Sequence, residues 1–292
     1  MEHPNLLALC RLFCRQLGLN APTSPMDFEH FRSLVESVME EAGVKRPGQA
    51  RTADARVVRM FLLMACHSYQ RMLNPAPHPD AEMVEQVASA RREGPATKAN
   101  FAQSRCDEPS VCRRALEVRK RVPRGGSILL LGDDDGLSPL LTEDYKVTMI
   151  DLDQEIVEWI ARIAPAVRAE RCHVLQTPDG FIEAFQAVVA DPIRGMEAEW
   201  FLTAALKCLV PDGLFFWADH PDWNFAFPAL RFQAEKSMQF LQCLENWHCY
   251  PASTPLSEEE FTSLGREHQR FLELGRLISL WSNLYVFKKT SP

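Results

Sequence analysis

The sequence predicts an α/β protein in which a doubly wound parallel sheet follows an all-helical N-terminal domain. Residues 1 to about 100 show apolar residues at helical spacing and no convincing strand pattern. From Pro109 onward, short β-rich runs alternate with helical stretches, and a further β-rich segment, 277–289, follows near the end. This alternation is typical of right-handed βαβ units, whose sheet is covered by helices on both faces.

The N-terminal region is expected to form a helical bundle. Its second helix ends at Gly43, its third begins at a Thr52 cap, and three prolines in 74–80 interrupt the pattern before another helix. The expected helices cover 6–19, 27–43, 52–73 and 81–93. We therefore divide the chain into a helical domain, 1–95, and a catalytic domain, 96–292.

The second domain is expected to begin with a helix and to continue as alternating strands and helices. The predicted helices are 109–122, 153–163, 195–209 and 229–247, and the predicted strands are 128–132, 146–151, 172–176, 185–191 and 213–219. The segment 277–289 is read as two β runs around Ser282 and Asn283. A terminal β pair added to five parallel strands is typical of the Rossmann-like class I methyltransferase-like fold.

Composition excludes several classes of protein. The formal net charge of -7 argues against nucleic acid as a partner. No apolar run reaches the roughly 20 residues needed to cross a bilayer, so we expect a cytoplasmic protein that does not act at a membrane. Six basic residues form one local patch, interpreted as a solvated helix face: Arg113, Arg114, Arg119, Lys120, Arg121 and Arg124.

Neither a metal site nor the oligomeric state is defined by the sequence. Cys243, His248 and Cys249 lie close together but have no fourth ligand nearby, so no metal is expected. The helical domain could cover the active-site crevice or pair subunits, which leaves a homodimer possible.

Four predicted strands end in carboxylates. The first strand runs into Gly132, Asp133, Asp134, Asp135 and Gly136, and further acidic residues follow the later strands: Asp151, Asp191, Asp219 and Asp222. Since ligands of doubly wound sheets bind outside the carboxyl ends of the strands, we expect these side chains to meet in one crevice.

The position of Asp151, about twenty residues after Gly132, is where a carboxylate accepts ribose hydroxyls in nucleoside-binding folds. The loop keeps two glycines but lacks GxGxxG, and three anions there would repel a pyrophosphate. Two unit charges about 4 Å apart interact with roughly 4 kcal/mol at an effective dielectric near 20. The loop therefore favours an ammonium group over a phosphate or carboxylate.

The acidic loop resembles a known family. GDDD after an apolar strand, DLD after the second strand and DP after the fourth are similar to the branched-chain polyamine synthases, aminopropyltransferases that build branched polyamines on spermidine. The preceding DEPSVCRRALEVRKR resembles that family's TPETTV-type helix, and the resemblance spans residues 103 to 220. It implies decarboxylated S-adenosylmethionine as the aminopropyl donor and a small-molecule amine as the acceptor.

The resemblance also implies roles for individual residues. In linear spermidine synthases the loop reads GGGDGG, and its acidic residue falls at Asp135, which we expect to orient or deprotonate the acceptor amine. We expect Asp191 to be the second catalytic carboxylate and Asp151 to bind the ribose hydroxyls. The donor-binding loop residues are Gly132, Asp133, Asp134 and Gly136. Near the fifth strand end, Asp219, His220 and Asp222 are candidates for binding the acceptor.

One motif departs from the family. Where the family reads DPPE, this chain reads Asp191, Pro192, Ile193, Arg194. A base replaces an acidic residue that would hold a polycation, which argues against spermidine as the acceptor. Arg194 would suit an acceptor that carries a carboxylate, or it could turn to solvent.

Three other functions fit parts of this pattern. A methyltransferase that uses S-adenosylmethionine shares Asp151 and the Asp191–Pro192 pair, although it must tolerate the donor's carboxylate at the acidic loop. A nicotianamine-synthase-like aminobutanoyl transferase would explain the helical N-terminal domain. A degenerate fold that binds a nucleoside without catalysis would explain the altered DPIR motif.

Overall fold

The computed structural model describes residues 78–98, 103, 105–192, 198–219, 227–250 and 280–291. All of them fall in one compact unit, residues 76–256 and 279–292. The helices expected in 6–73 lie outside the described residues, and the domain boundary at residue 95 stays a prediction. Among the described helices, none combines the length and apolar character that a membrane crossing requires.

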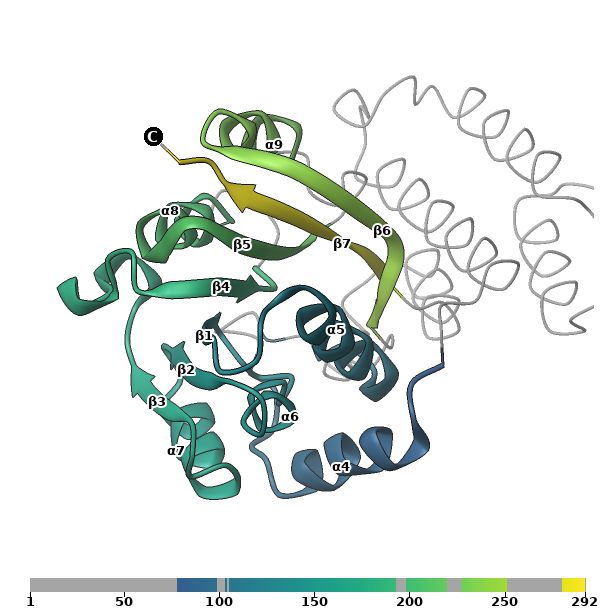
Figure 1. Ribbon diagram of the computed structural model, residues 1–292. Coiled ribbons are helices and arrows are strands. Elements are labelled where there is room, and N and C mark those ends of the chain that lie inside the picture. The colour runs from purple at the N-terminus through teal and green to yellow at the C-terminus, as the bar shows by residue number, and fades with distance from the viewer. Residues whose placement is uncertain are drawn as a thin grey trace, which may run out of the picture. The chain divides into compact units, whose positions relative to one another are not determined.

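A seven-stranded sheet forms the centre of this unit, with the order β3-β2-β1-β4-β5-β7-β6 (Figure 1). Its strands are β1 Ser127–Leu131, β2 Lys146–Asp151, β3 Arg168–Arg171, β4 Phe185–Ala190, β5 Leu209–Asp219, β6 Met238–Tyr250 and β7 Leu280–Lys289. Strands β1 to β5 pair in parallel, whereas β7 is antiparallel to both β5 and β6. The predicted doubly wound α/β fold is confirmed for this unit, and the antiparallel pair that completes the sheet consists of β6 and β7.

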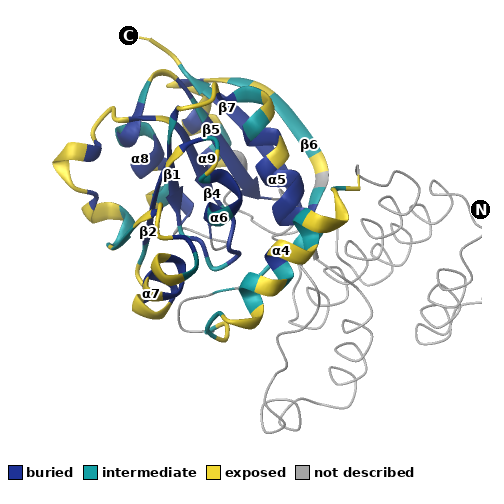
Figure 2. Cartoon of the chain, turned by 60° about the horizontal axis from the view of Figure 1, so that its bottom comes forward, coloured by how far each residue is buried: buried dark blue, intermediate teal, exposed yellow. Residues whose placement is uncertain are grey.

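Helices cover both faces of the sheet (Figure 1). They are α4 Ala81–Arg92, α5 Glu108–Arg121, α6 Ser138–Leu141, α7 Gln154–Ile163, α8 Ala198–Cys208 and α9 Phe227–Glu235. Residues of α5, α6 and α7 share one core cluster, and residues of α8 and α9 share a second. The outward sides of α4 and α7 remain exposed (Figure 2).

Strand β1 shows why an uninterrupted apolar run predicts a central strand. Ile128 and Leu130 pack into the first core, whereas Leu129 and Leu131 pack into the second. All four side chains are buried. A strand between two helical layers has no solvent-facing side, and it therefore needs apolar residues at every position rather than at every second one.

Three predicted elements differ from the structure. The helix expected over 229–247 is α9 followed by β6, because the chain turns at Lys236 and Ser237. The residues after that turn alternate between more and less buried positions from Met238 to Phe240, which is the period of a strand. The two terminal β runs are one strand, β7, and the third parallel strand lies at 168–171 rather than 172–176.

Gly136 is expected to resist substitution, because its φ is +75° and an added Cβ would lie 3.0 Å from Trp159 Cη2. Gly136→Ala should lower the free energy of unfolding by about 1–3 kcal/mol. Urea unfolding would measure this loss of stability. Gly125→Ala, with φ +79° and open space around it, isolates the backbone cost. Gly180→Ala has neither feature, and an equal loss there would contradict this prediction.

Candidate functional site

A cavity of about 210 Å³ opens at the carboxyl ends of β1, β2 and β4. Its lining includes five of the predicted site carboxylates, namely Asp133, Asp134, Asp135, Asp151 and Asp191, together with Gly132. The sequence-based expectation of one shared crevice holds for the ends of β1, β2 and β4, whereas Asp219 at the end of β5 is not among the described lining residues.

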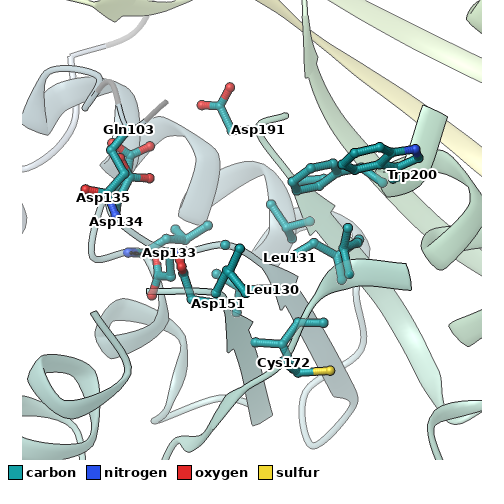
Figure 3. A pocket seen from close by; sticks show the side chains of 18 of the residues that line it. Gln103, Leu130, Leu131, Asp133, Asp134, Asp135, Asp151, Cys172, Asp191 and Trp200 are labelled. Carbon is teal, nitrogen blue, oxygen red and sulfur yellow. Dashed lines mark hydrogen bonds between the residues drawn. The ribbon is translucent and has the colours of Figure 1, made fainter. Parts of the chain in front are cut away.

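The two sides of the cavity differ in chemistry (Figure 3). Asp134 and Asp135 lie on one side, whereas Trp200 and Cys172 lie across from them. The apolar lining comes from strand ends and from α8, namely Leu130, Leu131, Ile150, Leu152, Val174, Val189, Ala190, Trp200 and Phe201. An acidic wall opposite an aromatic wall suits a ligand with a flat apolar part and a cationic part.

The aromatic wall was not predicted from the sequence. Trp217, at the end of β5, is fully buried and stacks on Phe215 with ring centroids 5.8 Å apart, so it belongs to the core. Trp200 is 40% exposed, and its ring lies 5.5 Å from the ring of His173. Trp200 lies on α8, where apolar and polar residues are mixed, and its position therefore gave no distinct signal in the sequence.

Asp133 is committed to the loop itself. Its Oδ1 accepts a hydrogen bond from Leu137 N at 2.6 Å, and its Oδ2 accepts one from Ser138 N at 2.9 Å. Burial raises its pKa to about 7, against the effect of the hydrogen bonds from Ser138 and Leu137. Donor binding by Asp133 stays a prediction, and the structure gives its carboxylate the task of fixing the start of α6.

Asp134 presents an unused oxygen. Within the described part of the chain, Oδ2 is inaccessible to solvent and has no hydrogen-bond partner. Burial raises the pKa of this carboxyl well above its usual range, and the neighbouring carboxylates of Asp135, Asp191 and Asp151 raise it further. A buried polar atom without a partner is costly, so this oxygen is suited to a ligand that donates a hydrogen bond.

Asp135 is surrounded by donors. Its Oδ1 accepts from Cys106 N at 2.9 Å and from Arg91 Nη2 at 3.1 Å. Its Oδ2 lies 3.2 Å from Cys106 Sγ and 3.3 Å from Arg114 Nη1. Only 5% of the side chain is exposed. Because both oxygens are engaged, Asp135 holds α4 and α5 against the loop, and its catalytic role stays a prediction.

The arginines around Asp135 also hold the loop backbone. Arg91 Nε donates to the carbonyl oxygen of Asp135 at 3.0 Å, and Arg105 Nε donates to that of Asp134 at 2.6 Å. Burial lowers the pKa of Arg105. At Arg91 burial also lowers the pKa, but Asp135, Cys106 and Glu108 together outweigh burial and raise it. The triple aspartate is therefore backed by guanidinium groups and is less negative than its sequence suggests.

Asp151 ends β2 at the floor of the cavity. Its Oδ1 accepts from Asp153 N at 2.8 Å, its Oδ2 accepts from Asp133 N at 3.3 Å, and burial raises its pKa. A Cβ on Gly132, whose φ is +80°, would lie 3.8 Å from Asp151 Oδ2. The glycine thus keeps the space in front of the carboxylate open, as ribose binding at this position would require. Asp153 caps α7 by accepting from Glu155 N.

Asp191 joins the site through Arg114. Its Oδ2 lies 2.6 Å from Arg114 Nη2, and 24% of its side chain is exposed, against 5% for Asp135. Arg114 Nε donates to His248 Nε2 at 3.1 Å, so Nδ1 of that ring carries the proton and faces Ser282 Oγ at 3.2 Å. Both ring nitrogens of His248 are thereby engaged.

The interpretation of the basic patch as a solvated face is wrong for two of its members. Arg113 and Arg114 are 5% and 3% exposed, whereas the side chain of Lys120 is 64% exposed. Helical spacing places Arg114 on the same face as Val111 and Val118, which are buried. An arginine on the apolar face of the helix was the one feature of the sequence that indicated the burial of Arg114. The sequence held no comparable signal for the other residues that contact the loop, namely Arg91, Arg105 and Cys106.

None of the remaining predicted residues is among the described residues that line the cavity. Asp219 is 6% exposed at the end of β5 and is not among the described lining residues. His220, Asp222 and Arg194 lie outside the described residues. The proposed acceptor-binding roles of these four residues stay predictions.

Comparison with known proteins places the site in a family context. Residues 82–215 match the family described as branched-chain polyamine synthase A C-terminal domain. No curated protein sequence matches the chain.

Solved structures share the fold. The branched-chain polyamine synthase from Thermus thermophilus, in complex with N4-aminopropylspermidine and 5'-methylthioadenosine, has a TM-score of 0.60 at 18% identity, covering 100% of this chain and 95% of that one. The C9 mutein of that enzyme, with the same ligands, has a TM-score of 0.59 at 17% identity, and the match covers 90% of this chain and 93% of that one. A putative RNA methyltransferase from Pyrococcus horikoshii gives 0.51 at 14%, covering 72% and 100%. At these identities, the likeness establishes the fold.

Proposed function

Residues 82–215 belong to the branched-chain polyamine synthase A C-terminal domain family, and from this premise we propose that the chain is an aminopropyltransferase. It would move an aminopropyl group from decarboxylated S-adenosylmethionine to an amine and release 5'-methylthioadenosine. The unpartnered Oδ2 of Asp134 carries the proposal, because it lies where a methyltransferase must leave room for the donor's carboxylate.

The nucleoside half of the donor fits the apolar side of the cavity. Asp151 would accept the ribose hydroxyls, and the adenine would lie between the β2 and β3 ends and the ring of Trp200. The Thermus structures contain 5'-methylthioadenosine, the product that aminopropyl transfer leaves behind. That ligand supports a nucleoside site in the same fold.

The cationic half of the donor would meet Asp134. Its propylammonium would donate to the oxygen that lacks a partner, and its sulfonium would lie near the same wall. Charge-assisted hydrogen bonds of this kind contribute roughly 1.5–3 kcal/mol. Intact S-adenosylmethionine would place a carboxylate beside Asp134 and Asp135, and the repulsion would weaken its binding.

The transfer itself is a displacement at carbon. The lone pair of the acceptor amine attacks the methylene attached to sulfur, the C–S bond breaks, and its electrons neutralise the sulfonium. The new ammonium then loses a proton. Asp191 is our candidate to orient the amine and receive that proton, because it lines the cavity and is more exposed than Asp135.

The first test is a calorimetric titration with decarboxylated S-adenosylmethionine, intact S-adenosylmethionine and 5'-methylthioadenosine. We expect the decarboxylated donor to bind at least tenfold more tightly than the intact one. Incubation with that donor and a set of amines should release 5'-methylthioadenosine, which mass spectrometry would detect. Preference for the intact donor, with methylated or aminobutanoylated products, would replace the proposal with one of the alternative transferases.

Donor binding is expected to strengthen as the pH rises. The raised pKa of Asp134 favours its protonated form in the empty site, whereas the donor's ammonium favours the carboxylate. Below that pKa, binding must expel a proton, and above it this cost disappears. Calorimetry in two buffers of different ionisation enthalpy would measure the released proton. An unchanged proton release in Asp134→Asn would assign it to another group.

A further inference from the structure

Arg114 is the only lysine or arginine among the described residues that line the cavity. Its side chain is 4% exposed, and its guanidinium is held on three sides. Nη1 lies 3.3 Å from Asp135 Oδ2, Nη2 lies 2.6 Å from Asp191 Oδ2, and Nε donates to His248. A cation fixed in the wall of a site expected to bind amines needs an explanation, and the inference drawn from it rests on the proposed function.

The charges around Arg114 balance. Arg91 and Arg114 supply two positive charges, and Asp135 and Asp191 supply two negative ones. Of the other lining carboxylates, Asp133 is bound to the start of α6 and Asp134 is reserved for the donor. The described part of the acceptor side therefore offers little net negative charge, although its sequence is strongly acidic.

A polyamine with three or more ammonium groups requires an excess of carboxylates along its length. The balanced cluster does not supply that excess, because Arg114 already occupies the position between Asp135 and Asp191 that an ammonium would otherwise take. The departure from DPPE to DPIR points in the same direction, since it removes a further acidic residue.

We propose that Arg114 determines acceptor specificity by acting as a built-in countercharge, so that the site takes amines of low positive charge, such as monoamines and diamines. Arg114 touches Asp191, which would orient the acceptor, and it offsets the tendency of that carboxylate to keep the amine protonated. The nucleophile must be neutral to attack carbon, so the same balance favours the reaction. Arg114 is in this sense a positioning residue.

The test is a series of acceptors supplied with decarboxylated S-adenosylmethionine: propylamine, 1,4-diaminobutane, spermidine and spermine. For the wild-type protein, we expect kcat/KM to be at least tenfold higher for the monoamine or diamine than for spermidine and spermine. Arg114→Gln should shift this ratio at least tenfold toward the polyamines. Lys120→Met, which removes a positive charge from the exposed side of the same helix, should leave the ratio unchanged.

The pH dependence of kcat separates this role from a structural one. Removing the countercharge should move the acid limb of the profile to higher pH, because the bound amine then holds its proton more strongly. The groups that face this position are Arg91 from α4, Cys106, Asp134, Asp135, Asp191 and His248. Arg114→Lys keeps the charge and should restore most of the acid limb.

If Arg114→Gln does not fold, the acceptor order of the wild-type protein remains decisive by itself. Wild-type preference for spermidine or spermine would overturn the inference and leave the proposed function standing. An unchanged acceptor ratio in a folded Arg114→Gln would also overturn it. Transfer to no amine, with no binding of the donor, would overturn the proposed function and this inference with it.

Discussion

Asp135→Asn is expected to lower the free energy of unfolding by about 3–5 kcal/mol, because it leaves two buried guanidinium groups without their charged partner. Arg91 would keep Glu108, which lies 3.2 Å away, and Arg114 would keep Asp191, which lies 2.6 Å away. The side-chain amide of the new asparagine would also place an N–H donor among neighbouring groups that are themselves donors. Urea unfolding, followed by circular dichroism, would measure the loss.

Asp144→Asn is the matched control for that variant. Asp144 also pairs with two arginines, Arg119 and Arg124, but the side chain of Arg124 is 86% exposed. Partly solvated pairs of this kind contribute about 0–1 kcal/mol. A loss for Asp135→Asn no larger than that for Asp144→Asn would show that the buried network does not stabilise the fold. A large loss of turnover with little loss of stability would instead support the catalytic role predicted for Asp135.

Asp134→Asn is expected to weaken binding of decarboxylated S-adenosylmethionine by about 10–100-fold, which corresponds to the loss of one charge-assisted hydrogen bond. Binding of intact S-adenosylmethionine should change less or improve, because a negative charge facing the donor's carboxylate is removed. Asp134→Gly should improve it further by opening space. The ratio of the two dissociation constants, measured by calorimetry, is the decisive quantity.

Asp179→Asn provides the control for net charge, because Asp179 is exposed and is not among the described residues that line the cavity. It should leave both dissociation constants unchanged. If Asp134→Asn weakens the binding of both donors equally, Asp134 supports the shape of the cavity and does not discriminate between donors with and without the carboxylate. The discrimination would then have to be sought elsewhere in the site.

The sequence was sufficient for the fold of the described unit because its signals were local. The buried runs of β1, β2 and β4 are uninterrupted, and Asp153 precedes α7 as an N-cap should. The error at β6 has a physical cause. Its residues are only partly buried, so the alternation is weak, and strand pairing with β7 overrides local helix preference.

The candidate site was predictable where it depends on strand order and not where it depends on packing. Topology alone places Asp134, Asp151 and Asp191 at one edge, since all three follow parallel strands. The partners of Asp135 come from α4, from residue 106 and from α5, and no spacing rule joins these segments. Tertiary contacts therefore reversed the expected electrostatics, from a bare acidic loop to one neutralised by arginines.

The insertion of β7 between β5 and β6 has a consequence for the order of folding. Strand β6 reaches the sheet only through β7, and at least 29 intervening residues separate the two along the chain, 251–279. Pairing across so long a separation in sequence is slow, so β6 and β7 should dock late and open together in native-state hydrogen exchange. His248, whose Nδ1 faces Ser282, would then leave Arg114 in the same event, and the position of the Arg114 guanidinium in the cavity wall would depend on the last pair of strands to assemble.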